Sequence, residues 1–179
     1  MRFAAGIAGA LMLMALAAPT AASAAPNATI TRSAAVAYGT CPAHSVMVTV
    51  TVPTTPFRPG QVVLYQVTIR NRSGRLCGPN HGPVAEVGDE PGIFGPCGPL
   101  PLRIVNVRGV TVYPPPEAIR CPAFFGPRLR GHQTLTAGGS WDQTQGGGRP
   151  ARVDHLVPRG AYHLTIAGEV SVPLVLSQP

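Results

Sequence analysis

The sequence contains no lysine and has few charged residues of either sign. All 14 basic residues are arginines, only seven residues are acidic, and charged residues make up 12% of the 179 residues. The composition excludes a long coiled coil, a helical bundle, a collagen-like chain and a polytopic membrane protein. A hydrophobic content of 45% argues against intrinsic disorder. Glycine and proline are abundant, with 21 residues each.

The one long hydrophobic run is at the N-terminus. Residues 4–18 are apolar, Arg2 precedes them, and Ala22-Ser23-Ala24 fits the A-x-A cleavage pattern. This combination predicts a signal peptide over residues 1–24, and hence a secreted or extracytoplasmic protein of the cell envelope. A retained membrane anchor is the alternative, but the run is short of the roughly 20 residues that span a bilayer. We expect no transmembrane segment after cleavage.

After cleavage about 155 residues remain, which is room for one domain. Residues 25–43 are rich in Ala, Thr and Ser and show no periodicity, so we expect a flexible leader, or else an irregular first strand. Residues 44–179 are expected to form the single domain.

Beyond residue 45, hydrophobic and polar residues alternate with a period of two, which indicates strands with one buried face. Pro173 suits an edge strand. Short strands separated by turn residues predict an all-β protein, an antiparallel immunoglobulin-like β-sandwich, with a small barrel as the alternative. The predicted strands cover residues 46–52, 61–70, 102–113 (broken or bulged at Gly109), 133–137, a segment holding Trp141, 162–166 and 170–176.

Export also bears on the four cysteines, Cys41, Cys77, Cys97 and Cys121. An even number of cysteines in an oxidising compartment predicts two disulfides. Three pairings are possible, and we favour Cys77–Cys97 with Cys41–Cys121 because the first pair brackets one loop. A zinc site would need Cys-x-x-Cys or closely spaced histidines, and neither occurs. We therefore expect no metal and no cofactor.

Two insertions rich in proline and glycine interrupt the strand spacing, at residues 72–101 and 114–131. Each holds at least one cysteine, which favours ordered structure. Loops of this length in a compact domain are often functional. They are expected either to cover open sheet edges or to form a recognition surface.

The C-terminal third carries the most specific pattern. Residues 141–143 read Trp-Asp-Gln, and residues 157–162 read Val-Pro-Arg-Gly-Ala-Tyr. This resembles the bacterial intracellular proteinase inhibitor (BsuPI) family, in which a W-D-Q strand leads to a turn and then V-P-x-G-x-Y. Residues 69–73, Ile-Arg-Asn-Arg-Ser, look like the strand and N-x-S element of the same family. The resemblance implies an immunoglobulin-like fold, and Trp141 and Tyr162 are expected to fill its core.

No pattern points to catalysis. The five histidines lack the spacing of a helical metal site, and there is no G-x-S-x-G elbow. The charge is more informative, because 13 arginines against seven acids leave the mature chain at +6. Arginine forks suit phosphate and carboxylate groups. Two clusters stand out, Arg70, Arg72 and Arg75 in one, and Arg120, Arg128 and Arg130 in the other.

We therefore expect an exported, non-catalytic binding module. Its partner would be an unknown protein or an anionic envelope polymer, not a specific nucleic acid, and the contact residues would include Arg70, Arg72, Arg120 and Arg128. The alternative is a protease inhibitor that places Arg120 of the 114–131 loop in a trypsin-like pocket. A further alternative is a structural surface module.

Overall fold

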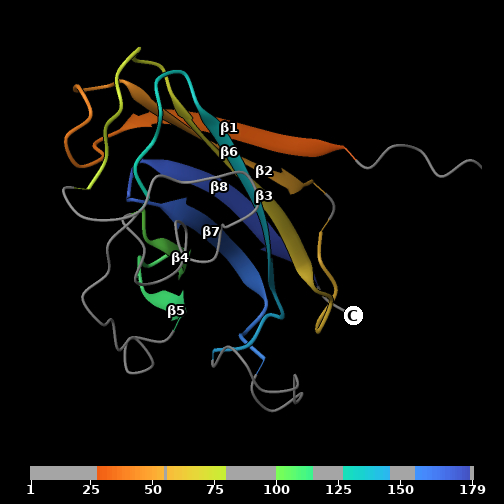
Figure 1. Cartoon of the computed structure of the whole chain (residues 1–179). Coiled ribbons are helices and arrows are strands. Elements are labelled where there is room, and N and C mark those ends of the chain that lie inside the picture. The colour runs from red at the N-terminus through yellow and green to blue at the C-terminus, as the bar shows by residue number, and fades with distance from the viewer. Residues whose placement is uncertain (1–27, 55, 80–99, 115–126, 146–155, 178–179) are drawn as a thin grey trace, which may run out of the picture.

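The computed structural model describes residues 28–54, 56–79, 100–114, 127–145 and 156–177 (Figure 1). The predicted signal peptide over residues 1–24 lies outside these ranges. The described chain is all-β, with no helix, and therefore none that could cross a membrane. Its strands are β1 (Thr29–Val36), β2 (Val46–Pro53), β3 (Val63–Asn71), β4 (Leu102–Asn106), β5 (Thr111–Tyr113), β6 (Thr134–Trp141), β7 (Gly160–Ile166) and β8 (Val170–Leu176).

The strands form two antiparallel sheets of four strands each, with the orders β1-β2-β3-β6 and β5-β4-β7-β8. The buried residues of the two sheets belong to one hydrophobic core. The alternation read from the sequence explains this directly, because every second residue of β2 and β8 is buried and the residues between them face outward. β8 is an edge strand, and Pro173 lies on its exposed side, as predicted.

Strand β1 lies within the segment that we expected to be a flexible leader. It pairs with β2 over its whole length. Its outward side chains bond across the strands, with the hydroxyl oxygens of Thr31 and Thr51 3.0 Å apart and those of Ser33 and Thr49 2.7 Å apart. Residues 29–36 therefore form a first strand that is regular and fully paired, and not a flexible leader. Small residues such as Ala and Ser give little contrast between buried and exposed positions, so the periodicity was weak.

Two other strand predictions were wrong in their boundaries. The single bulged strand over residues 102–113 is a hairpin of β4 and β5. Asn106 forms its turn, since the side-chain oxygen accepts hydrogen bonds from the backbone N–H groups of Arg108 (2.9 Å) and Val110 (3.0 Å), and Gly109 takes a positive φ of 77°. Conversely, the segment ending at Trp141 continues the strand predicted at 133–137, and both form β6.

The two aromatic residues of the C-terminal motif lie together in the core. Trp141 and Tyr162 are 1% and 4% exposed, and their rings meet edge to face with centroids 6.0 Å apart. Both polar groups are paired: the indole Nε1 donates to the carbonyl oxygen of Thr144 at 3.0 Å, and the Tyr162 hydroxyl donates to that of Pro158. The core therefore holds each ring in one orientation.

The glycine pair in β6 gives a test of the packing. Tyr65 lies across Gly139, so that a Cβ added there would be 2.3 Å from the ring, whereas one added at Gly138 would meet nothing closer than 3.9 Å. Burial, helped by Tyr113, raises the pKa of Tyr65 to about 12, so its phenol is neutral at physiological pH. We predict that Gly139→Ala lowers the free energy of unfolding by about 1–3 kcal/mol through overpacking. Gly138→Ala should change it by less than about 0.5 kcal/mol. Urea denaturation measures both, and equal values for the two variants would contradict this packing.

Candidate functional site

Three connections between strands meet at one end of the molecule. The register pairs Val46 with Asn71 and Arg70 with Thr134, so the end of β3 lies between the starts of β2 and β6. The connection between β1 and β2, the segment after β3 and the segment before β6 therefore emerge side by side, at the top of Figure 1. We call this surface, made of residues 37–45, 70–79 and 127–134, the basic end.

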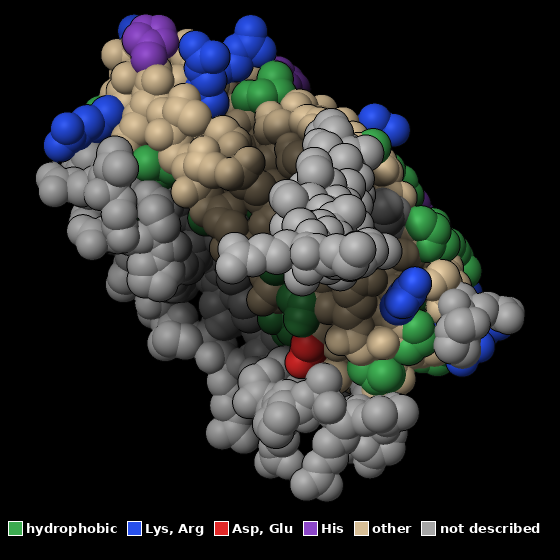
Figure 2. All heavy atoms as spheres, turned by 90° about the vertical axis from the view of Figure 1, so that its right-hand side faces the viewer, with side chains coloured by type: hydrophobic (Ala, Val, Ile, Leu, Met, Phe, Trp, Pro, Cys, Tyr) green, Lys and Arg blue, Asp and Glu red, His purple; other side chains and the backbone are tan. Residues whose placement is uncertain are grey.

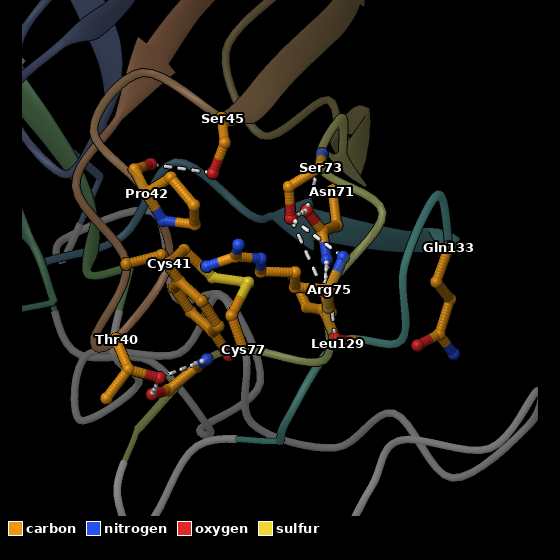
Figure 3. Close-up of a disulfide and its surroundings, with 12 residues drawn as sticks. Thr40, Cys41, Pro42, Ser45, Asn71, Ser73, Arg75, Cys77, Leu129 and Gln133 are labelled. Carbon is orange, nitrogen blue, oxygen red and sulfur yellow. Dashed lines mark hydrogen bonds between the residues drawn. A yellow bond between two sulfur atoms is a disulfide. The ribbon is translucent and has the colours of Figure 1, made fainter.

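A disulfide joins two of these segments (Figure 3). Cys41, between β1 and β2, bonds to Cys77, which follows β3, and their Cα atoms are 4.7 Å apart. The predicted pairing of Cys77 with Cys97 and of Cys41 with Cys121 is therefore wrong. Cys77 does not bond within its own loop, because the pairing of β1 with β2 and of β2 with β3 brings Cys41 beside the end of β3. Cys97 and Cys121 lie outside the described residues.

Backbone hydrogen bonds attach the third segment, residues 127–134, to the other two. Cys77 and Leu129 exchange both backbone bonds, at 3.0 and 2.7 Å, and so join the segment after β3 to the segment before β6. The Tyr38 hydroxyl donates to the Pro127 carbonyl at 2.7 Å, and the Thr40 N–H donates to that of Gly78 at 2.8 Å. All three segments are thus tied to one another, which limits their movement.

The side chain of Asn71 is the centre of this arrangement (Figure 3). It is fully buried. Its Nδ2 donates to the carbonyl oxygens of Arg75 at 2.8 Å and Arg130 at 2.9 Å, and its Oδ1 accepts from the N–H (2.9 Å) and the hydroxyl (2.7 Å) of Ser73. One amide therefore satisfies polar groups on two loops and fixes the backbone that carries the neighbouring arginines.

The structure brings together three of the four predicted contact residues. Arg70 is exposed at the end of β3, Arg72 is exposed beyond it, and Arg128 is half-buried beside Leu129. Arg120 lies outside the described residues. The two arginine clusters are separate in the sequence, and the pairing of β3 with β6 and the bridge at Cys77 bring them to one end. Arg75 and Arg130, which were not among the predicted contact residues, each lie within three residues of one.

The basic end is strongly cationic. Five of the ten described arginines belong to it, together with two histidines, and no acidic residue occurs in its three segments. Figure 2 shows arginine and histidine side chains gathered at this upper end of the molecule. Among the described residues there is no group of His, Cys, Asp or Glu that could hold a metal. The arrangement offers hydrogen-bond donors and positive charge, so its chemistry is that of anion binding.

The disulfide predicts a specific peptide map of the oxidised protein. Trypsin separates Cys41 from Cys77, and a glutamate-specific protease separates Cys77 from Cys97 by cleaving after Glu86. After blocking of free thiols, we expect a linked Cys41–Cys77 fragment that reduction splits in two. A linked Cys77–Cys97 fragment in mass spectrometry would contradict the structure.

The role of Asn71 can be tested by truncation. Asn71→Ala removes the Nδ2 donor from the carbonyls of Arg75 and Arg130 and the acceptor from the N–H of Ser73. The Arg130 carbonyl keeps its bond from the Gln133 N–H at 3.1 Å, so we expect a loss of about 2–3 kcal/mol in the free energy of unfolding. The matched control is Asn106→Ala in the β4–β5 turn, where water can replace the lost side chain and the loss should be about 1 kcal/mol. Hydrogen exchange should also show faster amide exchange in residues 72–79 of the Asn71 variant alone. Equal effects of the two substitutions on stability and exchange would refute this role.

Comparison of the chain with models of known protein families, with curated proteins and with solved structures finds no match. The resemblance of the C-terminal motif to the proteinase inhibitor family therefore stays a prediction. The function has to be argued from the geometry and the charge of the basic end.

Proposed function

We propose that this protein is an exported, non-catalytic binding module that contacts an anionic partner through its basic end. The observation that carries the proposal is that one buried amide and the Cys77–Leu129 backbone pair join the two chain segments that carry five arginines and no acid. The disulfide holds the third segment beside them. The partner is an anionic polymer or an acidic protein of the cell envelope.

Rigidity and charge both favour such a partner. A loop that is already ordered loses less conformational entropy on binding than a free one. The like charges of the arginines repel one another, and a polyanion that lies across them removes this repulsion. Guanidinium groups present paired donors that match carboxylate and phosphate oxygens. A polymer that repeats such groups can contact several arginines at once.

We infer that the fold is immunoglobulin-like. Leaving β1 aside, the sheet orders β2-β3-β6 and β5-β4-β7-β8 match the strands A-B-E and C′-C-F-G of that fold. The hydrogen bond from Tyr162, near the start of β7, back to Pro158 matches the tyrosine corner at the start of strand F. In this assignment the segment after β3 is the B–C loop, which is a recognition loop in antibody variable domains.

Export is supported by the disulfide, since such bonds persist in oxidising compartments. The protease-inhibitor alternative depends on Arg120, which lies outside the described residues, and no described contact favours it. The basic end therefore carries the proposed function.

Two triple variants with the same loss of charge test the proposal. One removes arginines of the basic end and the other removes exposed arginines elsewhere. Binding is measured on immobilised polygalacturonate and polyphosphate, which supply carboxylates and phosphates, between 50 and 300 mM NaCl. The variants are Arg70→Gln/Arg72→Gln/Arg128→Gln and, as the control, Arg32→Gln/Arg58→Gln/Arg103→Gln.

We expect the wild-type protein to bind at low salt and to weaken as salt screens the charges. The basic-end variant should lose about tenfold in affinity at 50 mM NaCl and the control variant less than about threefold, because charge gathered in one place attracts a polyanion more strongly than scattered charge. Equal losses in the two variants would show that only the net charge matters. No binding to either polymer would also overturn the proposal.

A further inference from the structure

A second group of arginines lies at the opposite end of the molecule. β6 starts at the basic end and ends at Trp141, about 25 Å away for a strand of this length. The β4–β5 turn and the start of β7 border an open cavity of about 660 Å³ there. Its lining includes Val107, Arg108, Val110, Arg159 and Tyr162.

One wall of the cavity is the β4–β5 turn, which is held rigidly. Besides the two bonds to its side chain, Asn106 donates its N–H to the Val110 carbonyl at 2.9 Å and accepts at its own carbonyl from Gly109 at 2.9 Å. The turn presents Val107 and Val110 to solvent, 70% and 56% exposed. Arg108 lies between these two valines in the sequence. The wall therefore combines a cation with two aliphatic side chains that nothing in the described chain covers.

The other wall is the segment that enters β7. Arg159 follows Pro158, whose carbonyl accepts the hydrogen bond from the buried Tyr162, and precedes Gly160, which takes a positive φ of 146°. The Tyr162 hydrogen bond on one side, and the pairing of Gly160 with Leu176 of β8 on the other, hold the backbone around Arg159. Its guanidinium group is exposed and borders the same cavity as Arg108.

The charged side chains that line this cavity in the described chain are all positive. Among the described residues, two arginines line it and no acidic residue does. The two exposed valines lie at its rim, so a ligand that covers them removes apolar surface from water. Its volume is within the range of small-molecule sites. A ligand that fits must be negatively charged at one end and aliphatic along the rest.

We propose that the cavity between the β4–β5 turn and the start of β7 binds a small carboxylate with an aliphatic chain. The carboxylate pairs with Arg108 and Arg159, and the chain lies against Val107 and Val110. A phosphate ion lacks the aliphatic part, and an alcohol of the same chain length lacks the charge. The site is independent of the basic end.

The test titrates the oxidised mature protein, labelled with ¹⁵N, with octanoate, inorganic phosphate and 1-octanol in separate NMR experiments. We expect octanoate to shift the amide signals of Val107, Arg108, Val110 and Arg159 in a saturable way. Phosphate and octanol should bind at least about tenfold more weakly, because phosphate contacts only the arginines and octanol only the valines. No saturable shift with octanoate would overturn the proposal. Equal binding of phosphate would reduce the cavity to an anion site, and equal binding of octanol would reduce it to an apolar patch.

Variants separate the two contributions. Arg108→Gln/Arg159→Gln should weaken octanoate about tenfold, since it removes both charged partners. The control Arg32→Gln/Arg103→Gln has the same change in charge at positions outside the cavity and should leave the affinity unchanged. Val110→Ser keeps the backbone bonds of the turn and should weaken octanoate about threefold but not acetate. Equal weakening by the two double variants would overturn the site. Loss of polyanion binding in any of these variants would mean that the two ends are not independent.

Discussion

The amide of Asn71 is the interaction on which the basic end depends. A buried polar side chain is favourable only when its donors and acceptors are all paired, and this one reaches two loops that have no regular ladder of their own. The residue ends β3 and pairs with Val46 of β2, so the sheet sets the position of its backbone. The two loops are bonded to a side chain that the sheet holds in place.

Holding five arginines together opposes folding, because like charges repel at short range. The Cys77–Leu129 backbone pair and the Asn71 amide join the two segments that carry these arginines, through links that do not titrate near neutral pH and that salt does not screen. The repulsion therefore remains as a property of the folded surface rather than being relieved by movement of the loops. A bound polyanion removes it, which makes the same feature unfavourable for folding and favourable for binding.

The sequence allowed the strands with strong alternation to be predicted. β2 and β8 place valine or leucine at every second position, and β3 and β7 place valine, isoleucine, leucine or tyrosine there over most of their length, so the pattern shows clearly which residues are buried. β1 was ambiguous because its small residues fit either side of an edge strand. The β4–β5 hairpin was missed because its turn is made by the side chain of Asn106, and Val107 and Val110 continue the hydrophobic pattern through it.

For the candidate site, the sequence predicted which residue types take part but not that they lie at one end of the molecule. Arg70 and Arg128 are far apart in the chain, and only the register of β3 with β6 and the bridge at Cys77 place them at one end. The disulfide was mispredicted for the same reason. Cys41 lies beside Cys77 only because β1 is a strand, and the small residues of β1 did not reveal it as one. Asn71 gave no signal beyond its place in an N-x-S element, since burial of a polar residue is visible only once its partners are in place.

The two ends of the molecule present arginine in different surroundings, and this difference predicts how each responds to salt. At the basic end the guanidinium groups lie among polar loops in contact with water, where an ionic atmosphere screens them within about 8 Å at physiological ionic strength. In the far cavity, Val107 and Val110 border the charges, and a ligand chain that covers these valines excludes water from the ion pairs. Pairs shielded in this way are screened less. As the salt concentration rises, a polyanion should therefore leave the basic end before an aliphatic carboxylate leaves the cavity, although arginines make both contacts.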